Sequence, residues 1–102
     1  MSTLIKIKEL VLDGKVIFTV KAGIEMERDG LLPRMVFQAI INAPVINKTL
    51  RSADPETGAR EYLHVIISSS YDGTIIYTKG KIKKVENEDT FYILISSKRS
   101  IG

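Results

Sequence analysis

The segment from Glu61 to Lys98, EYLHVIISSSYDGTIIYTKGKIKKVENEDTFYILISSK, decides the fold. It holds three runs rich in β-branched and aromatic residues, which are typical of strands. Tyr71-Asp72-Gly73 and Asn87-Glu88-Asp89 separate the runs and have the composition of tight turns. Three strands joined by short turns predict an antiparallel meander. The expected strands span residues 61–68, 74–85 and 90–98.

The residues before this segment have a helical pattern instead. Apolar residues follow Ser2 and Thr3 at helical spacing, and Asp13-Gly14 would end that helix. Pro33 suits the first turn of another helix, which ends before Pro44 because the residue preceding a proline resists helical angles. The other elements expected are a short extended piece at 16–20, a helix at 21–29, a strand at 45–50 and a loop at 52–60.

A chain of 102 residues has room for one domain with one core. We therefore expect a single domain over 1–102, helical in about 1–44 and built of antiparallel strands in about 45–102. Helices followed by strands predict an α+β fold, in which the N-terminal helices pack on one face of the C-terminal antiparallel sheet. An exposed strand edge would let two copies pair, although nothing in the sequence requires a homodimer.

The composition excludes several kinds of site. Without cysteine and with a single histidine, the chain has no disulfide scaffold, no thiol nucleophile and no metal site built on cysteines or on two histidines. No phosphate-binding glycine motif is present, so we expect no metal and no cofactor. No apolar run approaches the ~20 residues that cross a bilayer, so no membrane contact is expected. Lys6, Lys8 and Glu9 interrupt the apolar block of a signal peptide, which favours a cytoplasmic protein.

A basic run, KGKIKK at 79–84, dominates the second predicted strand. Because successive strand residues point to opposite faces, its odd-numbered lysines share one face with Tyr77, unless Gly80 marks a bulge. The same alternation puts Tyr92 and Lys98 together. Lysines beside tyrosines suit an RNA strand, since cations neutralise phosphates and rings stack on bases, but lysines also solvate sheet edges. The candidate RNA-binding residues are Tyr77, Lys79, Lys81, Lys83, Tyr92 and Arg99.

Two side chains of the first predicted strand are candidates for proton transfer. His64 is the only side chain whose ordinary pKa lies near neutrality, and Glu61 is a carboxylate at the start of the strand. The alternatives are a half-buried, hydrogen-bonded histidine and a solvated glutamate. The acidic residues Glu25, Glu27 and Asp29 are expected on an exposed helix face, where the absence of nearby histidine or cysteine makes a metal site improbable.

The order of these segments resembles a known family. A short N-terminal helix leads to Thr19, then to KAGIEMERDGLLPRMVFQAIINA at 21–43, then to a strand, a loop and a meander that ends in FYILISSKR at 91–99. This layout resembles bacterial toxins of the RelE superfamily, particularly the MqsR-type (motility quorum-sensing regulator) branch, and a related family of small domains of unknown function. Those domains begin with a T-x-H-A…R-M helix, in which this chain has Lys21 for the histidine and Glu25 for the arginine.

The resemblance implies a helix-backed antiparallel sheet and a metal-independent endoribonuclease that cleaves mRNA, in some members only on the ribosome. The ribose 2′-hydroxyl attacks the adjacent phosphate, which needs a base, cations for the developing charge and an acid. Lys48 and Lys98 match the family's phosphate-binding lysines. Glu61 or His64 would transfer protons, and Tyr77 or Tyr92 would stack on a base.

The expected function is therefore a toxin of a toxin–antitoxin system, an endonuclease of the mRNA interferase type that cuts single-stranded RNA and is neutralised by a cognate antitoxin. The alternative is a non-catalytic module of the same fold that binds RNA or protein. Convergence of Lys48, Glu61, His64 and Lys98 on one concave sheet face would favour the enzyme. A His64 packed under the helices would favour the binding module.

Overall fold

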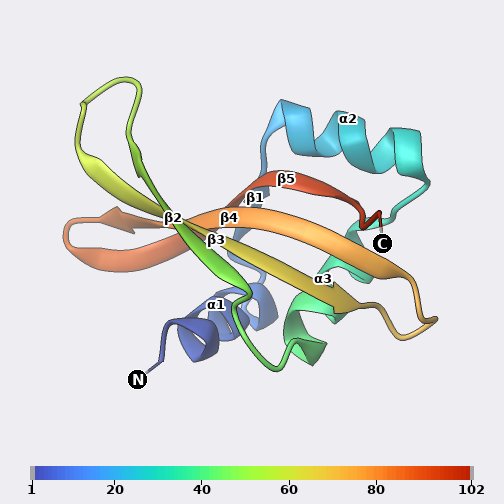
Figure 1. Ribbon diagram of the computed structural model, residues 1–102. Coiled ribbons are helices and arrows are strands. Elements are labelled where there is room, and N and C mark those ends of the chain that lie inside the picture. Colours follow the sequence, from blue (N-terminus) through green and yellow to red (C-terminus); the bar gives the residue numbers. More distant parts are fainter. Residues whose placement is uncertain (1, 102) are drawn as a thin grey trace.

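The computed structural model describes residues 2–101, which form three helices and a five-stranded sheet (Figure 1). The α+β class is confirmed, with all three helices preceding the four strands of the second half. Along the chain the elements are α1 (Thr3–Leu12), β1 (Val16–Phe18), α2 (Val20–Asp29), α3 (Pro33–Asn42), β2 (Lys48–Ala53), β3 (Arg60–Ser69), β4 (Ile75–Val85) and β5 (Glu88–Arg99).

Local chemistry sets the ends of the helices. The side chains of Ser2 and Thr19 cap α1 and α2 by accepting hydrogen bonds from backbone N–H groups three residues later, both at 3.2 Å. Gly30 ends α2 in the left-handed conformation, with a φ of 68°, which glycine adopts without a side-chain clash. Pro33 opens α3 in its first turn, as the sequence predicts.

The strands form one sheet in the order β1-β5-β4-β3-β2. Strands β2 to β5 are antiparallel neighbours, which confirms the predicted meander. Strand β1 pairs with β5 in parallel, so the sheet is mixed and not purely antiparallel. The sequence indicated only an extended piece at this position, because the strand that β1 joins lies at the far end of the chain.

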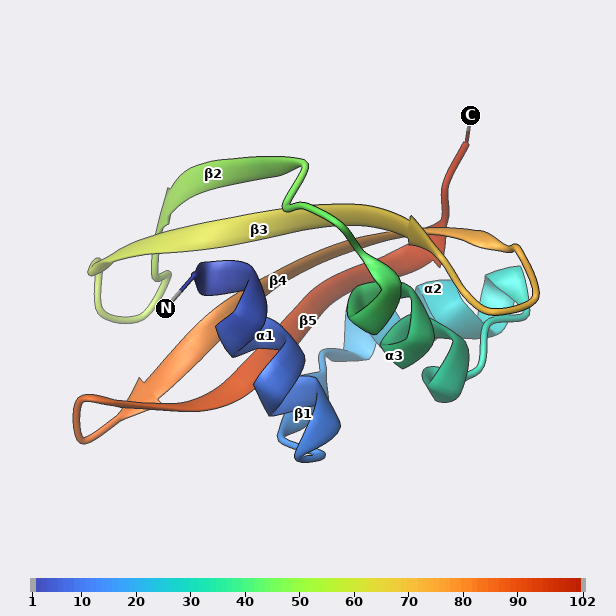
Figure 2. The same cartoon turned by 90° about the horizontal axis from the view of Figure 1, so that it is seen from below.

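Helices α1 and α3 lie on one face of the sheet, where their apolar sides meet β3, β4 and β5 (Figure 2). Helix α2 instead runs along the edge of β5, beyond the point where β1 ends (Figure 1). The expected packing of helices on one sheet face thus holds for α1 and α3 but not for α2. We call the face opposite α1 and α3 the open face. The core under α1 and α3 includes Ile7, Leu10, Val36, Ile40, Ile66, Ile76, Tyr92 and Leu94.

Strands β3 and β4 are paired over only part of their length. The pairing runs from His64 with Gly80 to Ser69 with Ile75. Beyond Gly80, β4 pairs only with β5, and before His64, β3 pairs only with β2. The sheet therefore divides into two hairpin arms, β2–β3 and β4–β5, which diverge in Figure 1. We call the space between the arms the fork.

Gly80 lies where the arms separate, beside a shift in the β4–β5 register. This bulge, which the glycine indicated, arises because Ile95 lies between the β5 residues that pair with Lys79 and Gly80. The extra residue belongs to β5, so the alternation of faces is kept in β4 and reversed in β5. The prediction that Tyr92 and Lys98 share a face is therefore wrong: Tyr92 faces the helices, and Lys98 lies on the open face.

Candidate nucleic-acid interface

The open face gathers most of the residues expected to bind RNA or to act on it. The register defines this face, since Lys48 pairs with Val65, Val65 with Lys79, and Tyr77 with Lys98. Other residues join it by the alternation along each strand. The predicted site residues on the open face are Lys48, Glu61, Tyr77, Lys79, Lys81, Lys83 and Lys98.

Lys48 and Lys79 flank Val65 on its two neighbouring strands. Val65 is buried although it points away from α1 and α3. Lysine side chains can bury their apolar stems while the ammonium group stays in water, which is compatible with a buried valine between two lysines. Neither lysine makes an ion pair with another residue in the described range 2–101. Two uncompensated positive charges therefore lie close together on the open face.

Tyr77 and Lys98 are in contact on the same face. The Lys98 Nζ lies 5.3 Å from the centroid of the Tyr77 ring, within the range of a cation–π interaction. Lys79 is the next residue of β4 on this face, so one aromatic ring lies among the ammonium groups of β4 and β5. A half-buried ring with cations around it offers both a stacking surface and phosphate neutralisation.

Glu61 and Lys81 neutralise each other. The Lys81 Nζ donates a hydrogen bond to the Glu61 Oε2 at 2.8 Å, and both side chains are mostly buried. Glu61 belongs to β3 and Lys81 to β4, in the part where these strands are no longer paired. The ion pair therefore bridges the two arms across the fork. Because Glu61 compensates its charge, Lys81 attracts RNA phosphates less strongly than Lys79 does. Glu61 in turn is held in an ion pair and is not free to act as a general base.

His64 lies on the helix-covered face, and only 8% of its surface is exposed. Its Nδ1 is 3.3 Å from the Thr49 hydroxyl oxygen. Burial lowers the pKa of His64 below its usual 6.5, so the imidazole is neutral at pH 7. The structure does not bring His64 together with Lys48 and Lys98, because those lysines lie on the opposite face of the sheet.

Two of the expected RNA-binding residues are occupied by contacts within the fold. Tyr92 is fully buried in the core, and burial raises the pKa of its hydroxyl, so this ring is not available to stack on a base. Arg99 binds the end of α2, where its Nε donates a hydrogen bond to the Asp29 carbonyl oxygen at 2.9 Å. These placements remove Tyr92 from the interface and bind the Nε of Arg99 to the end of α2.

Glu25 was expected on an exposed helix face, and that expectation is wrong. Its Oε1 accepts hydrogen bonds from the Ser96 hydroxyl at 2.8 Å and from the Ser97 N–H at 3.1 Å. Burial raises the pKa of Glu25, but these hydrogen bonds and the charges of Lys21 and Lys98 outweigh it and hold the pKa below the usual 4.5. The carboxylate thus accepts a hydrogen bond from a backbone N–H of β5 that would otherwise be free to pair with a further strand. Glu25 closes this edge of the sheet.

The predicted catalytic residues do not form one reaction centre. Lys48 and Lys98 share the open face, but they lie on the first and last of four antiparallel strands. Three strand spacings of ~4.8 Å put their backbones at least about 14 Å apart, so they would contact different phosphates. Glu61 is paired with Lys81, and His64 lies on the other face. The arrangement supports binding of an extended anionic chain better than attack on a single phosphodiester.

The described residues 2–101 contain no cluster of three or more histidine or acidic side chains that would hold a metal ion. The same range contains no helix that is long and apolar enough to cross a bilayer. Comparisons of the chain with protein-family models, with curated proteins and with solved structures find no match.

Proposed function

We propose that this protein binds single-stranded RNA on the open face of its sheet. The observation that carries this proposal is a row of cations on the face that α1 and α3 leave uncovered: Lys79 and Lys98 lie beside Tyr77, and Lys48 lies farther along the same face. None of these lysines makes an ion pair within residues 2–101. RNA phosphates take up cations, and an unpaired base stacks on an aromatic ring. A duplex would keep its bases away from Tyr77, so single strands are the preferred form.

Cleavage of the bound RNA is a second candidate, favoured by the contact between Tyr77 and Lys98. The toxin-like pattern predicts Lys98 as a phosphate-binding lysine and Tyr77 as a base-stacking ring, and Lys79 lies beside them on the open face. A phenol among ammonium groups offers a proton-transfer group and charge for a phosphorane. In this function the substrate is mRNA, free or on the ribosome, and the partner is a cognate antitoxin.

Binding is tested by fluorescence anisotropy with a labelled 12-nucleotide single-stranded RNA and with the matching duplex. We expect the wild type to bind the single strand more tightly. Lys79→Ala/Lys98→Ala should weaken binding at least tenfold and flatten the salt dependence, because each lost phosphate contact lowers the slope of log K against log salt by ~0.7. The control Lys6→Ala/Lys15→Ala removes the same charge from the helical side of the molecule and should bind nearly as the wild type does.

RNA binding on the open face is excluded if the wild type binds neither RNA, or if the two double variants weaken binding to the same extent.

Cleavage is tested separately, by inducing expression of the protein in bacteria at matched protein levels. A toxin arrests growth, and Lys48→Ala/Lys98→Ala should then relieve the arrest. Normal growth with the wild type would exclude an active toxin while leaving RNA binding intact.

A further inference from the structure

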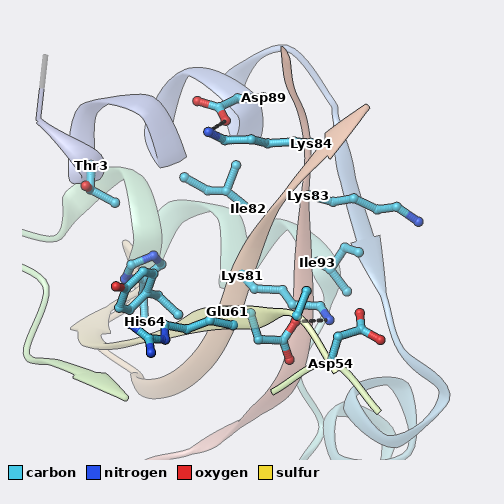
Figure 3. Close-up of a pocket in the computed structure, with 13 residues that line it drawn as sticks. Thr3, Asp54, Glu61, His64, Lys81, Ile82, Lys83, Lys84, Asp89 and Ile93 are labelled. Atoms are coloured by element: carbon cyan, nitrogen blue, oxygen red, sulfur yellow. Dashed lines mark hydrogen bonds and ion pairs between the residues drawn. The ribbon is translucent and has the colours of Figure 1, made fainter. Parts of the chain in front are cut away.

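The fork holds a cavity of about 690 Å³ that is open to solvent (Figure 3). Side chains of both sheet faces line it: Tyr62 and His64 from the helix-covered side, and Lys81 and Ile93 from the open face. Because β3 and β4 are unpaired there, the gap between them connects the two sides of the sheet. The Glu61–Lys81 ion pair spans this gap on the open-face side, so a group that enters from the open face passes this pair to reach Tyr62 and His64.

Charge in the fork favours an anionic ligand. Lys81 is paired with Glu61 at 2.8 Å, and the Lys84 Nζ lies 4.0 Å from an Asp89 carboxylate oxygen (Figure 3). The Asp54 carboxylate, also in the lining, accepts hydrogen bonds from two backbone N–H groups of its own loop. Asp54 keeps its negative charge, so the lining carries four cations and three carboxylates, a net charge of +1. Of the cations, Arg60 and Lys83 make no ion pair within residues 2–101.

The polar groups in the fork suit a nucleobase. Tyr62 keeps 46% of its surface exposed, so its ring is available for stacking. His64 lines the same cavity with 8% of its surface exposed, and its Nδ1 lies 3.3 Å from the Thr49 hydroxyl oxygen. The edges of β3 and β4 that face each other across the fork also carry backbone donors and acceptors without a strand partner. Base edges present donors and acceptors of the same kind.

We propose that the fork is a pocket for one unpaired nucleotide of the RNA that crosses the open face, an inference that rests on the proposed function. The base enters between the arms and stacks on Tyr62. Its phosphates meet Arg60 and Lys83 at the rim, and Lys83 continues the lysine row of β4. The free cations of the lining, and its continuity with that row, favour a nucleotide over a peptide strand.

The test uses 12-nucleotide uridine RNAs that each carry 2-aminopurine at one position, since stacking on a tyrosine ring quenches this fluorescent base. We expect strong quenching at one or two positions on binding to the wild type. Tyr62→Ala should abolish that quenching and weaken binding at least fivefold, and Tyr62→Phe should restore both. The control Tyr71→Ala removes a ring that is 71% exposed in the turn at the other end of the sheet. This control should change neither the quenching nor the RNA affinity.

Equal quenching and affinity in the wild type and in Tyr62→Ala would overturn the nucleotide pocket while leaving RNA binding on the open face in place. Failure of the wild type to bind any of these RNAs would overturn the proposed function itself. Loss of quenching in Tyr62→Phe as well would also contradict the pocket, because the stacking ring is still present in that variant.

Discussion

Gly80 and Tyr92 together fix the point at which the two arms separate. A methyl group at residue 80 would lie 2.6 Å from the Tyr92 ring, which is fully buried. The ring therefore packs directly over the glycine backbone, beside the bulge and the last β3–β4 pair. The last β3–β4 pair and the bulge thus lie at a residue whose missing side chain makes room for the Tyr92 ring.

Gly80→Ala should accordingly destabilise the fold by about 1–3 kcal/mol, because the extra methyl group has to displace a buried ring. Gly23→Ala is the matched control. Gly23 lies inside α2 with no atom near its missing side chain, so alanine should stabilise the protein by about 0.5–1 kcal/mol there. Urea unfolding followed by circular dichroism measures the free energy of unfolding of both variants. Equal changes in the two variants would contradict the close packing of the Tyr92 ring on Gly80.

Glu25 stabilises the fold through the edge of β5. Glu25→Ala leaves the Ser96 hydroxyl and the Ser97 N–H buried without their acceptor, so we expect the free energy of unfolding to fall by about 2–3 kcal/mol. The control Glu27→Ala changes an exposed residue of the same helix and should lower it by less than about 0.5 kcal/mol.

The stabilisation by Glu25 should depend on pH. Because the pKa of Glu25 is lowered in the native protein, its stabilisation is complete above pH 4.5 and is lost as the pH falls through the native pKa. The difference in the free energy of unfolding between the wild type and Glu25→Ala should therefore become smaller below pH 4.5. A difference that does not change with pH would contradict the conclusion that the Glu25 carboxylate stabilises the fold in its charged form.

At the scale of elements, the two arms are joined across the fork by the ion pair of Glu61 with Lys81. Glu61→Gln frees the Lys81 ammonium group beside the open face and removes a negative charge. We expect RNA affinity to rise by about threefold at low salt. The free energy of unfolding should fall by about 1–3 kcal/mol, because the substitution removes one charge of a mostly buried, hydrogen-bonded pair. Glu56→Gln makes the same charge change in the exposed loop of the β2–β3 arm and is the control for that substitution.

Anisotropy titrations of these two variants at 50 mM salt would compare them directly. Weaker binding by Glu61→Gln than by the wild type would mean that Glu61 contacts the RNA favourably, contrary to its place in an ion pair. A rise of the same size in Glu56→Gln would show that overall charge, and not the freed Lys81, sets the affinity.

The whole molecule shows which features local sequence patterns can predict. Caps, turn residues and apolar spacing predicted the helices and the meander, because those signals lie within the elements themselves. The parallel pairing of β1, the burial of Glu25 and the fork depend on partners far along the chain, so no local pattern indicated them. The extra residue Ile95 in β5 reversed the predicted face of Lys98 relative to Tyr92. That reversal puts Lys98 on the face where the β4 lysines already lie.

The central claim, that RNA lies across the open face, is tested most directly by nuclear magnetic resonance. Isotope-labelled wild-type protein is titrated with a 12-nucleotide single-stranded RNA, and the backbone amide signals are followed. We expect the largest shifts at Val65, Tyr77, Lys79 and Lys98 and along the facing edges of the fork, with α1 and α3 almost unchanged. Shifts concentrated on the exposed sides of α1 and α3, or no shifts at all, would contradict the account.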